Sequence, residues 1–141
     1  MNEDQIQLKT VSKTDMDFLF ILLNNRDPKN NISHNKMPSF KQHKKFVLSK
    51  PYLKWYVIFY NFEKIGTIYL SKQNEIGIHF VNKPIKSFVF IQSIKLLIQK
   101  THKKKYFINI SPSNLKYRSL FKKYGFNLIQ QTYAIESNEL S

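Results

Sequence analysis

The sequence predicts a single α/β (α+β) domain over residues 1–141, with a mixed central sheet and helices on both faces. Three runs rich in aromatic and β-branched residues follow one another between residues 54 and 81, which indicates an antiparallel meander. After them, two amphipathic stretches alternate with strand-like segments, which indicates crossover connections onto the same sheet. The length suits one domain, and a hydrophobic content of 42% favours an ordered core.

The individual elements follow from periodicity, capping residues and chain breakers. Strands are expected at 6–11, 54–60, 64–71, 75–81, 106–110 and 126–135. Helices are expected from Ser12 or Thr14 to about Asn25, from Pro38 or Ser39 onward, over 87–104 and over 113–124. The polar, proline-containing stretch 26–37 is expected to be a loop. The predicted order is therefore β-α-α-β-β-β-α-β-α-β.

The two later helices have predicted apolar stripes. These are Phe88, Ile91, Ile94, Leu97 and Ile98 in the first, and Tyr117, Leu120, Phe121 and Tyr124 in the second. The second is expected to end at Gly125, because glycine takes the left-handed conformation that closes a helix without a Cβ penalty.

Composition narrows the class of protein. The chain has no cysteine, which excludes a disulfide framework and thiolate metal sites. No signal peptide and no apolar run near the ~20 residues of a membrane span are recognised, so a cytoplasmic protein is expected. The histidine spacings match no familiar zinc pattern, and no metal is expected.

The formal net charge of +14 raises the question of nucleic-acid binding. Of the 23 basic residues, only Arg26 and Arg118 are arginines, whereas base and bidentate phosphate recognition favour arginine. The excess of Lys, Asn, Ile and Phe also fits a bias toward A·T-rich codons. A solvated lysine surface is therefore the favoured interpretation, and nucleic acid is not the expected partner. A basic patch that attracts a phosphate-bearing ligand stays open.

The stretch "NISPSNLKYRSLFKKYGF", residues 109–126, contains a strand end, a polar break, an amphipathic helix and a Gly-Phe step. This order resembles the late motif of the GNAT superfamily of acyl-CoA N-acyltransferases. The residues that carry the resemblance are Asn114, Leu120, Phe121, Gly125 and Phe126. The element order extends the resemblance to about residues 4–136, and the meander "IGTIYL…EIGIHF" supports it.

The resemblance implies an N-acetyltransferase that moves an acetyl group from acetyl-CoA to a primary amine of a small molecule. Acetyl-CoA is then expected at the splayed end of the sheet, between the third meander strand and the strand before the last helix. The implied cofactor-binding residues are Phe80, Val81, Lys83, Lys86, Ser87, Phe88, Asn114 and Phe121.

Catalytic and acceptor-side candidates are few. Glu75 opens the third meander strand, where some family members carry a base, and His79 shares its face by the two-residue period of a strand. The two are predicted as a base and its orienting partner, or as a water relay. Arg26, His34 and His43 are predicted substrate-side residues, because their arrangement resembles that of family members acting on nucleotide-linked amino sugars.

Two departures from the family pattern leave alternatives open. The segment 81–93, where the family places its glycine-rich pyrophosphate loop, contains no glycine. Phe121 stands where many members have a tyrosine general acid. A non-catalytic GNAT-like binding domain and a basic nucleic-acid-binding module are the alternatives, and the chain is expected to be a monomer or homodimer.

Overall fold

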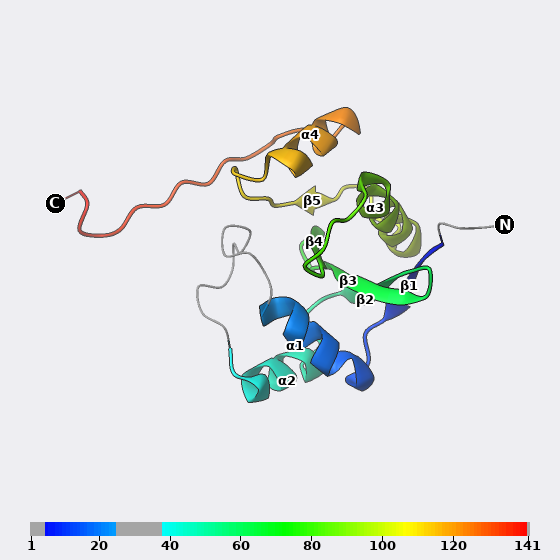
Figure 1. Cartoon of the computed structure of the whole chain (residues 1–141). Helices are drawn as coiled ribbons and strands as arrows, with labels where there is room; N and C mark the ends of the chain where they lie inside the picture. Colours follow the sequence, from blue (N-terminus) through cyan, green and yellow to red (C-terminus); the bar gives the residue numbers. More distant parts are fainter. Residues whose placement is uncertain (1–4, 25–37, 141) are drawn as a thin grey trace.

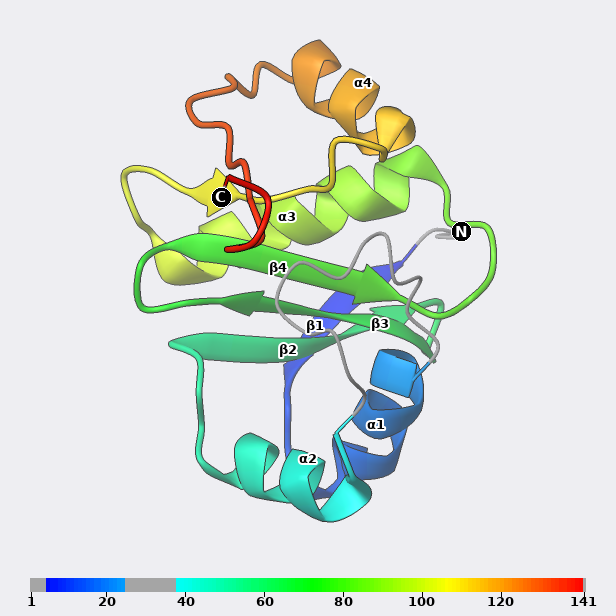
Figure 2. The same cartoon turned by 90° about the vertical axis from the view of Figure 1, so that its left-hand side faces the viewer.

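The computed structural model describes residues 5–24 and 38–140, which form a five-stranded sheet between two layers of helices (Figure 1). The strands are β1 (Ile6–Thr10), β2 (Lys54–Tyr60), β3 (Glu63–Leu70), β4 (Glu75–Phe80) and β5 (Phe107–Ile108). The helices are the 3₁₀ turn η1 (Lys13–Asp15), α1 (Met16–Asn24), α2 (Phe40–Leu48), α3 (Ser87–Thr101) and α4 (Leu115–Lys123). Figure 2 shows α3 and α4 on one side of the sheet and α1 and α2 on the other.

The sheet has the strand order β1-β2-β3-β4-β5. Neighbouring strands are antiparallel from β1 to β4, whereas β4 and β5 are parallel. The predicted mixed sheet, meander and helices on both faces are thus confirmed. Asn61 and Phe62 turn the chain between β2 and β3 with positive φ angles of 48° and 69°. Positive φ at both central residues is typical of the type I′ turn, which is favoured in two-residue hairpins.

The main core lies between the sheet and α3, which packs against β1 and β3. Successive side chains along each strand alternate between the two faces, and the α3-facing ones include Ile58, Ile68 and Leu70, all fully buried. The predicted α3 stripe was partly wrong. Phe88 and Ile98 are each 38% exposed, and the helix instead buries the neighbouring Val89, Phe90 and Ser93. The helix is rotated relative to the predicted stripe, because Phe90 also supports α4.

The N-terminal helices begin at the predicted caps. Ser12 and Asp15 form a capping box before α1, and Ser39 caps α2 through its hydroxyl oxygen, which accepts from the backbone N–H of Gln42. Asp15 also forms an ion pair of 2.9 Å with Lys64 of β3. Burial alone would raise the pKa of Asp15, but hydrogen bonds from Lys64 and Ser12 and the Lys64 charge lower it below its usual value. This carboxylate therefore ties the start of α1 to the sheet.

The last helix also begins and ends as expected. The Asn114 side chain accepts a hydrogen bond of 3.3 Å from the Tyr117 backbone N–H, which satisfies one of the free amides of the first turn. Gly125 follows the helix with φ = 83°, in the left-handed region. The backbone N–H of Phe126 then donates to the Phe121 carbonyl at 2.9 Å, and the two rings stack with centroids 4.7 Å apart.

The predicted final strand, 126–135, was wrong. Phe126 is half-buried against α4, but every residue from 127 to 140 is exposed and none of them is in a strand. Figure 1 shows this segment, hereafter the tail (residues 127–140), running away from the body. A strand requires a partner for its backbone groups, and among the described residues the tail pairs with no strand of the sheet.

Candidate functional site: a cleft where the sheet splays

A cleft opens where β4 and β5 separate. The two strands pair only at Glu75↔Phe107 and Ile76↔Ile108. Beyond those pairs β4 continues to Phe80, while the chain after β5 turns toward α4. A cavity of about 1110 Å³ opens there and extends across the sheet to α1 and α2. Its volume is slightly above the usual range of about 300–1,000 Å³ for small-molecule sites.

The β4 wall of the cleft carries Glu75, Gly77 and His79 on one face. The ring of Tyr69, the cross-strand partner of Gly77, lies over the glycine, and a Cβ at Gly77 would overlap the end of that ring. The chain has only three glycines. This one is needed because it leaves the space in which the Tyr69 ring rests against β4.

Glu75 and His79 do share a face, as predicted, but Tyr69 lies between them. Four strand residues span about 13 Å. The Glu75 carboxylate accepts a hydrogen bond of 3.2 Å from Asn109 Nδ2, across the gap to the chain after β5. The His79 and Tyr69 rings have centroids 6.3 Å apart. A proton relay along this wall would therefore pass Tyr69, rather than run directly from His79 to Glu75.

The side of the cleft nearest α2 is an aromatic wall, formed by Phe46, Tyr52, Trp55 and Tyr69. Tyr52 and Tyr69 stack with centroids 3.7 Å apart and planes within 8°. Trp55 meets Tyr52 edge-on at 5.0 Å. The Trp55 indole N–H donates to the Thr67 hydroxyl at 2.8 Å, and that hydroxyl donates to the Tyr56 carbonyl at 2.8 Å. The wall is fixed both by packing and by this hydrogen-bonded chain.

His43 lines the same side of the cleft and is only 5% exposed. Burial lowers the pKa of His43, an effect only partly offset by its hydrogen bond to the Met16 backbone. Its Nε2 atom has no hydrogen-bond partner among the described residues. Because the lowered pKa favours neutral imidazole, Nε2 can accept a hydrogen bond from a donor that enters the cleft.

The opposite end of the cleft meets the loop 81–86 and the start of α3. Lys86 is the N-cap residue of α3 and makes no side-chain capping bond, so it does not satisfy the free amides of the first turn. Lys83 pairs with Glu63 at 3.4 Å, on the surface. Lys116 of α4 reaches the loop, where its ammonium donates to the Ile85 carbonyl at 3.0 Å. Amides at a helix start together with nearby ammonium groups form an environment suited to phosphate.

Asn114, the N-cap residue of α4, and Tyr117 within the helix line the cleft. Tyr117 stacks on Phe90 with centroids 4.2 Å apart, and burial raises the pKa of its phenol. Phe121 lies one turn further on, is 9% exposed, and packs in the core against Phe90 and Phe126. The α4 phenol in the cleft is thus Tyr117, while Tyr124 is 45% exposed beyond it.

The predicted site residues fall into three groups. Seven line the cleft: Glu75, His79, Phe80, Val81, Lys83, Asn114 and His43. Four are not part of its lining: Lys86, Ser87 and Phe88 at the exposed start of α3, and Phe121 in the core. Arg26 and His34 lie outside the described residues.

Sequence reasoning did not identify Tyr69, Lys116 or the aromatic wall. Gly77 was an available signal for Tyr69, because a glycine inside a strand often marks the close approach of another group. Lys116 and the aromatic wall had no comparable signal, since lysine and aromatic residues are abundant throughout this chain.

No protein-family model matches the chain, and no curated protein matches it in sequence. Solved structures do match. A domain from Methanocaldococcus jannaschii has a TM-score of 0.70 at 20% identity, and 92% of each chain is covered. The ribosomal L7/L12 α-N-protein acetyltransferase RimL, solved with coenzyme A, has a TM-score of 0.69 at 17% identity, covering 89% of this chain and 81% of that one.

A third match is spermidine N-acetyltransferase from Vibrio cholerae, solved with coenzyme A and spermine. Its TM-score is 0.67 at 18% identity, over 86% of this chain and 80% of that one. The chain has the GNAT fold, shared with these N-acetyltransferases.

Proposed function

We propose that the protein is an acetyl-CoA-dependent N-acetyltransferase that acts on a primary amine. The observation that supports this most is the cleft itself. One end is lined by Lys116 and by residues 81–85 of the loop that leads into the uncapped start of α3, and the other by an aromatic wall and a buried histidine. An anionic ligand and an amine-bearing one can therefore enter from opposite ends and meet at β4.

The residues present fit coenzyme A as a co-substrate. The amides that begin α3, with Lys83 and Lys116, would hold its phosphates, and Asn114 lines the path beside α4. Phe80 and Val81, at the end of β4, border the same path. Acetyl-CoA supplies a thioester whose carbonyl carbon forms the new bond to nitrogen as the carbon–sulfur bond breaks. The lysine ammonium groups would supply part of the phosphate binding that closely approaching backbone amides supply in a glycine-rich loop.

The side chains on the cleft walls would handle protons. The attacking amine must be neutral, so Glu75, His79 or a water bound to one of them would accept its proton. Tyr117 would donate a proton to the leaving sulfur. Its raised pKa keeps the phenol protonated at neutral pH, and it faces the cleft where Phe121 does not. This assigns the acid role to the residue one helical turn before the family position.

The acceptor would lie against the aromatic wall, with His43 Nε2 accepting a hydrogen bond from it. Among the matched structures, those named as enzymes act on spermidine, on aminoglycosides and on the α-amino group of a ribosomal protein. A nucleotide-linked amino sugar remains a proposed acceptor here. The aromatic wall would bind an acceptor that carries a flat or apolar group beside its amine.

A thermal-shift measurement tests cofactor binding directly. Ligand at about 100 times its dissociation constant adds about 2.7 kcal/mol, which raises Tm by several degrees. Acetyl-CoA and CoA should produce this shift and ATP should not. Lys116→Met should reduce the shift, whereas Lys95→Met, at an exposed position of α3 outside the cleft lining, should not.

Catalysis is then tested by release of free thiol with a panel of amines. The panel should contain polyamines, aminoglycosides, nucleotide-linked amino sugars and peptides with free α-amino groups. If acetyl-CoA binds but no amine yields thiol, the proposal of catalysis fails. The non-catalytic binding domain, which the glycine-free loop favours, then replaces it.

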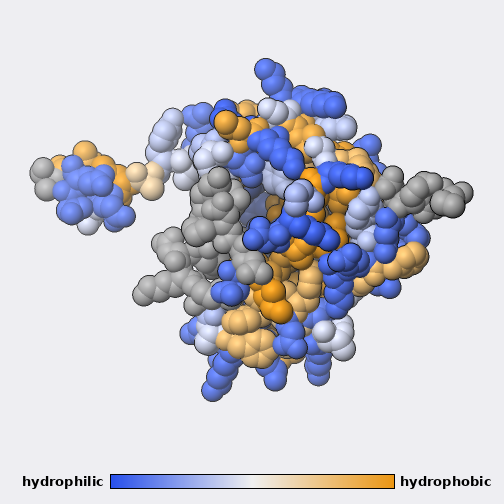
Figure 3. All heavy atoms as spheres, viewed as in Figure 1, coloured by the Kyte–Doolittle hydropathy of each residue, from blue (hydrophilic) through white to orange (hydrophobic). Residues whose placement is uncertain are grey.

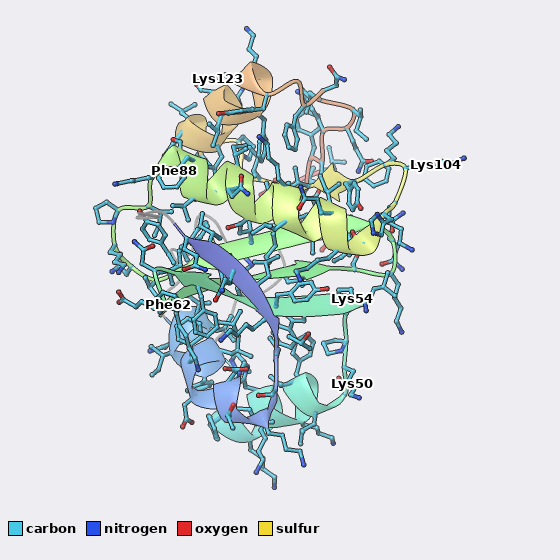
Figure 4. All side chains as sticks on the ribbon, turned by 90° about the vertical axis from the view of Figure 1, so that its right-hand side faces the viewer. Lys50, Lys54, Phe62, Phe88, Lys104 and Lys123 are labelled. Atoms are coloured by element: carbon cyan, nitrogen blue, oxygen red, sulfur yellow. The ribbon has the colours of Figure 1, made fainter. Side chains whose placement is uncertain are left out.

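The nucleic-acid alternative has less support. The lysines labelled in Figure 4 come from the end of α2, from β2, from the α3–β5 connection and from the end of α4. Lysines thus lie on several separate elements, with basic groupings in α4 and at Lys103–Lys105, rather than on one element alone. Nucleic-acid binding that persists at physiological salt would contradict this interpretation.

A further inference from the structure

The tail is the part of the described chain that the fold does not use. Its large apolar side chains are exposed, from 57% for Ile135 to 87% for Tyr133. Figure 3 shows it separated from the body, with hydrophobic residues among hydrophilic ones. Residues 127–135 are rich in Leu, Ile, Thr and Tyr, contain no proline and carry no charge. Such a segment has the composition of a strand that lacks a partner.

The sheet of the same fold has an edge strand with room for such a partner. β5 is the last strand of the sheet and pairs with β4 on one side. No strand lies on its other side within the described ranges. Phe107 and Ile108 remain half-buried rather than buried, and an unpaired edge of this kind accepts a further strand readily.

The charges of the tail and of this edge are complementary. The tail contains Glu136 and Glu139 and none of the 23 basic residues. The edge is flanked on one side by the run Lys103–Lys105 and on the other by the basic helix α4. Attraction between opposite charges therefore favours this edge as the docking place of the tail, over a surface without basic residues.

We infer that the tail of each chain pairs with the β5 edge of a second copy, so that two copies exchange their tails reciprocally. Up to Phe126 the chain is held on its own body, by the Phe126–Phe121 backbone bond and ring stack. Beyond Phe126 it runs outward, away from its own β5, as Figure 1 shows. Each copy offers one tail and one edge, so the exchange closes with twofold symmetry and leaves neither exposed.

The exchange would also complete the cleft. Ile108, Asn109 and Ile110 line it, and Asn109 holds the Glu75 carboxylate. A strand from the second copy would pair with this segment from behind. It would fix a wall that in one copy alone is held by two residue pairs of β4.

The first test is the mass of the full chain in solution, measured by light scattering or sedimentation. A dimer is expected. Thr132→Pro and Tyr133→Pro each remove one backbone N–H, and neighbouring N–H groups in a strand point to opposite sides. At least one of the two should weaken the dimer by roughly tenfold or more. Ser137→Pro, beyond the apolar segment, should not. A monomer at high micromolar concentration, or a dimer insensitive to both prolines, would overturn the inference.

A second test separates exchange from folding of the tail onto its own edge. The chain has no cysteine, so single cysteines can be placed without background. Two single variants, Lys105→Cys and Gln131→Cys, are mixed, refolded together and treated with a flexible bis-maleimide, and linkage between the two chains is expected. The variant that carries both substitutions is treated in the same way. If only this double variant reacts, as a monomer linked within itself, the tail docks on its own body and the inference is wrong.

Discussion

Gly77→Ala tests the arrangement of Tyr69 across β4. An added methyl group would occupy the space of the Tyr69 ring end, although the backbone itself tolerates alanine, since Gly77 has no positive φ. The ring must move away and lose its stack on Tyr52, in which the centroids lie 3.7 Å apart. An aromatic pair of this kind contributes about 0.5–1.5 kcal/mol beyond its buried area. We expect a loss of about 1 kcal/mol in the free energy of unfolding, or roughly 4 °C in Tm.

The matched control is the same substitution in a Tyr69→Ala background. Without the ring there is nothing for the methyl group to displace. Gly77→Ala should then be neutral, or stabilising by a few tenths of a kcal/mol, because alanine restricts the unfolded chain. Denaturant unfolding of the four proteins gives the coupling energy, expected to be about 1 kcal/mol. A coupling near zero would show that the Tyr69 ring does not rest over Gly77, and the description of this wall of the cleft would have to be abandoned.

Three further measurements follow from the site and the core. Tyr117→Phe should lower kcat for acetyl transfer by about tenfold to a hundredfold while the affinity for CoA stays unchanged, because the phenol donates a proton and does not hold the phosphates; an unaltered kcat would remove Tyr117 from the acid role. The pKa of His43 is lowered in the folded state, so the unfolded chain binds its proton first as the pH falls below about 6.5, and stability should decrease there. His43→Phe should flatten that part of the stability–pH curve, and identical curves for both proteins would refute the argument. Leu120→Ala, at a position 7% exposed, should cost about 2–5 kcal/mol in urea unfolding, whereas Leu115→Ala, 65% exposed, should cost far less.

Local signals in the sequence were sufficient for most of the fold. Ser12, Ser39 and Asn114 are caps whose effect depends on neighbours within one helical turn. The meander strands are marked by their aromatic and β-branched composition, and Gly125 marks the end of α4 through its own backbone preference.

The missed features depend on contacts between distant segments. The rotation of α3 that buries Phe90 depends on Tyr117 and Phe121, some thirty residues away. The exposure of the tail could not be predicted either, because its strand-like composition says nothing of which edge, or which molecule, supplies the partner. In the cleft, Glu75 was predicted from the family resemblance and His79 from the two-residue period of the strand. The Tyr69 ring that separates them comes from the neighbouring strand β3, and no periodicity in the sequence relates Tyr69 to residues of β4.

The contact between Lys116 and the Ile85 carbonyl has a mechanical consequence. It joins the loop before α3 to the first turn of α4, the helix from whose far end the tail departs. A lysine ammonium has three donors, so it can keep this bond and still contact an anion. A ligand that draws the ammonium toward itself would strain a link between two helices. If ligand binding favours one position of α4 and so changes how the tail docks, docking of the tail must change the affinity for the ligand by the same factor.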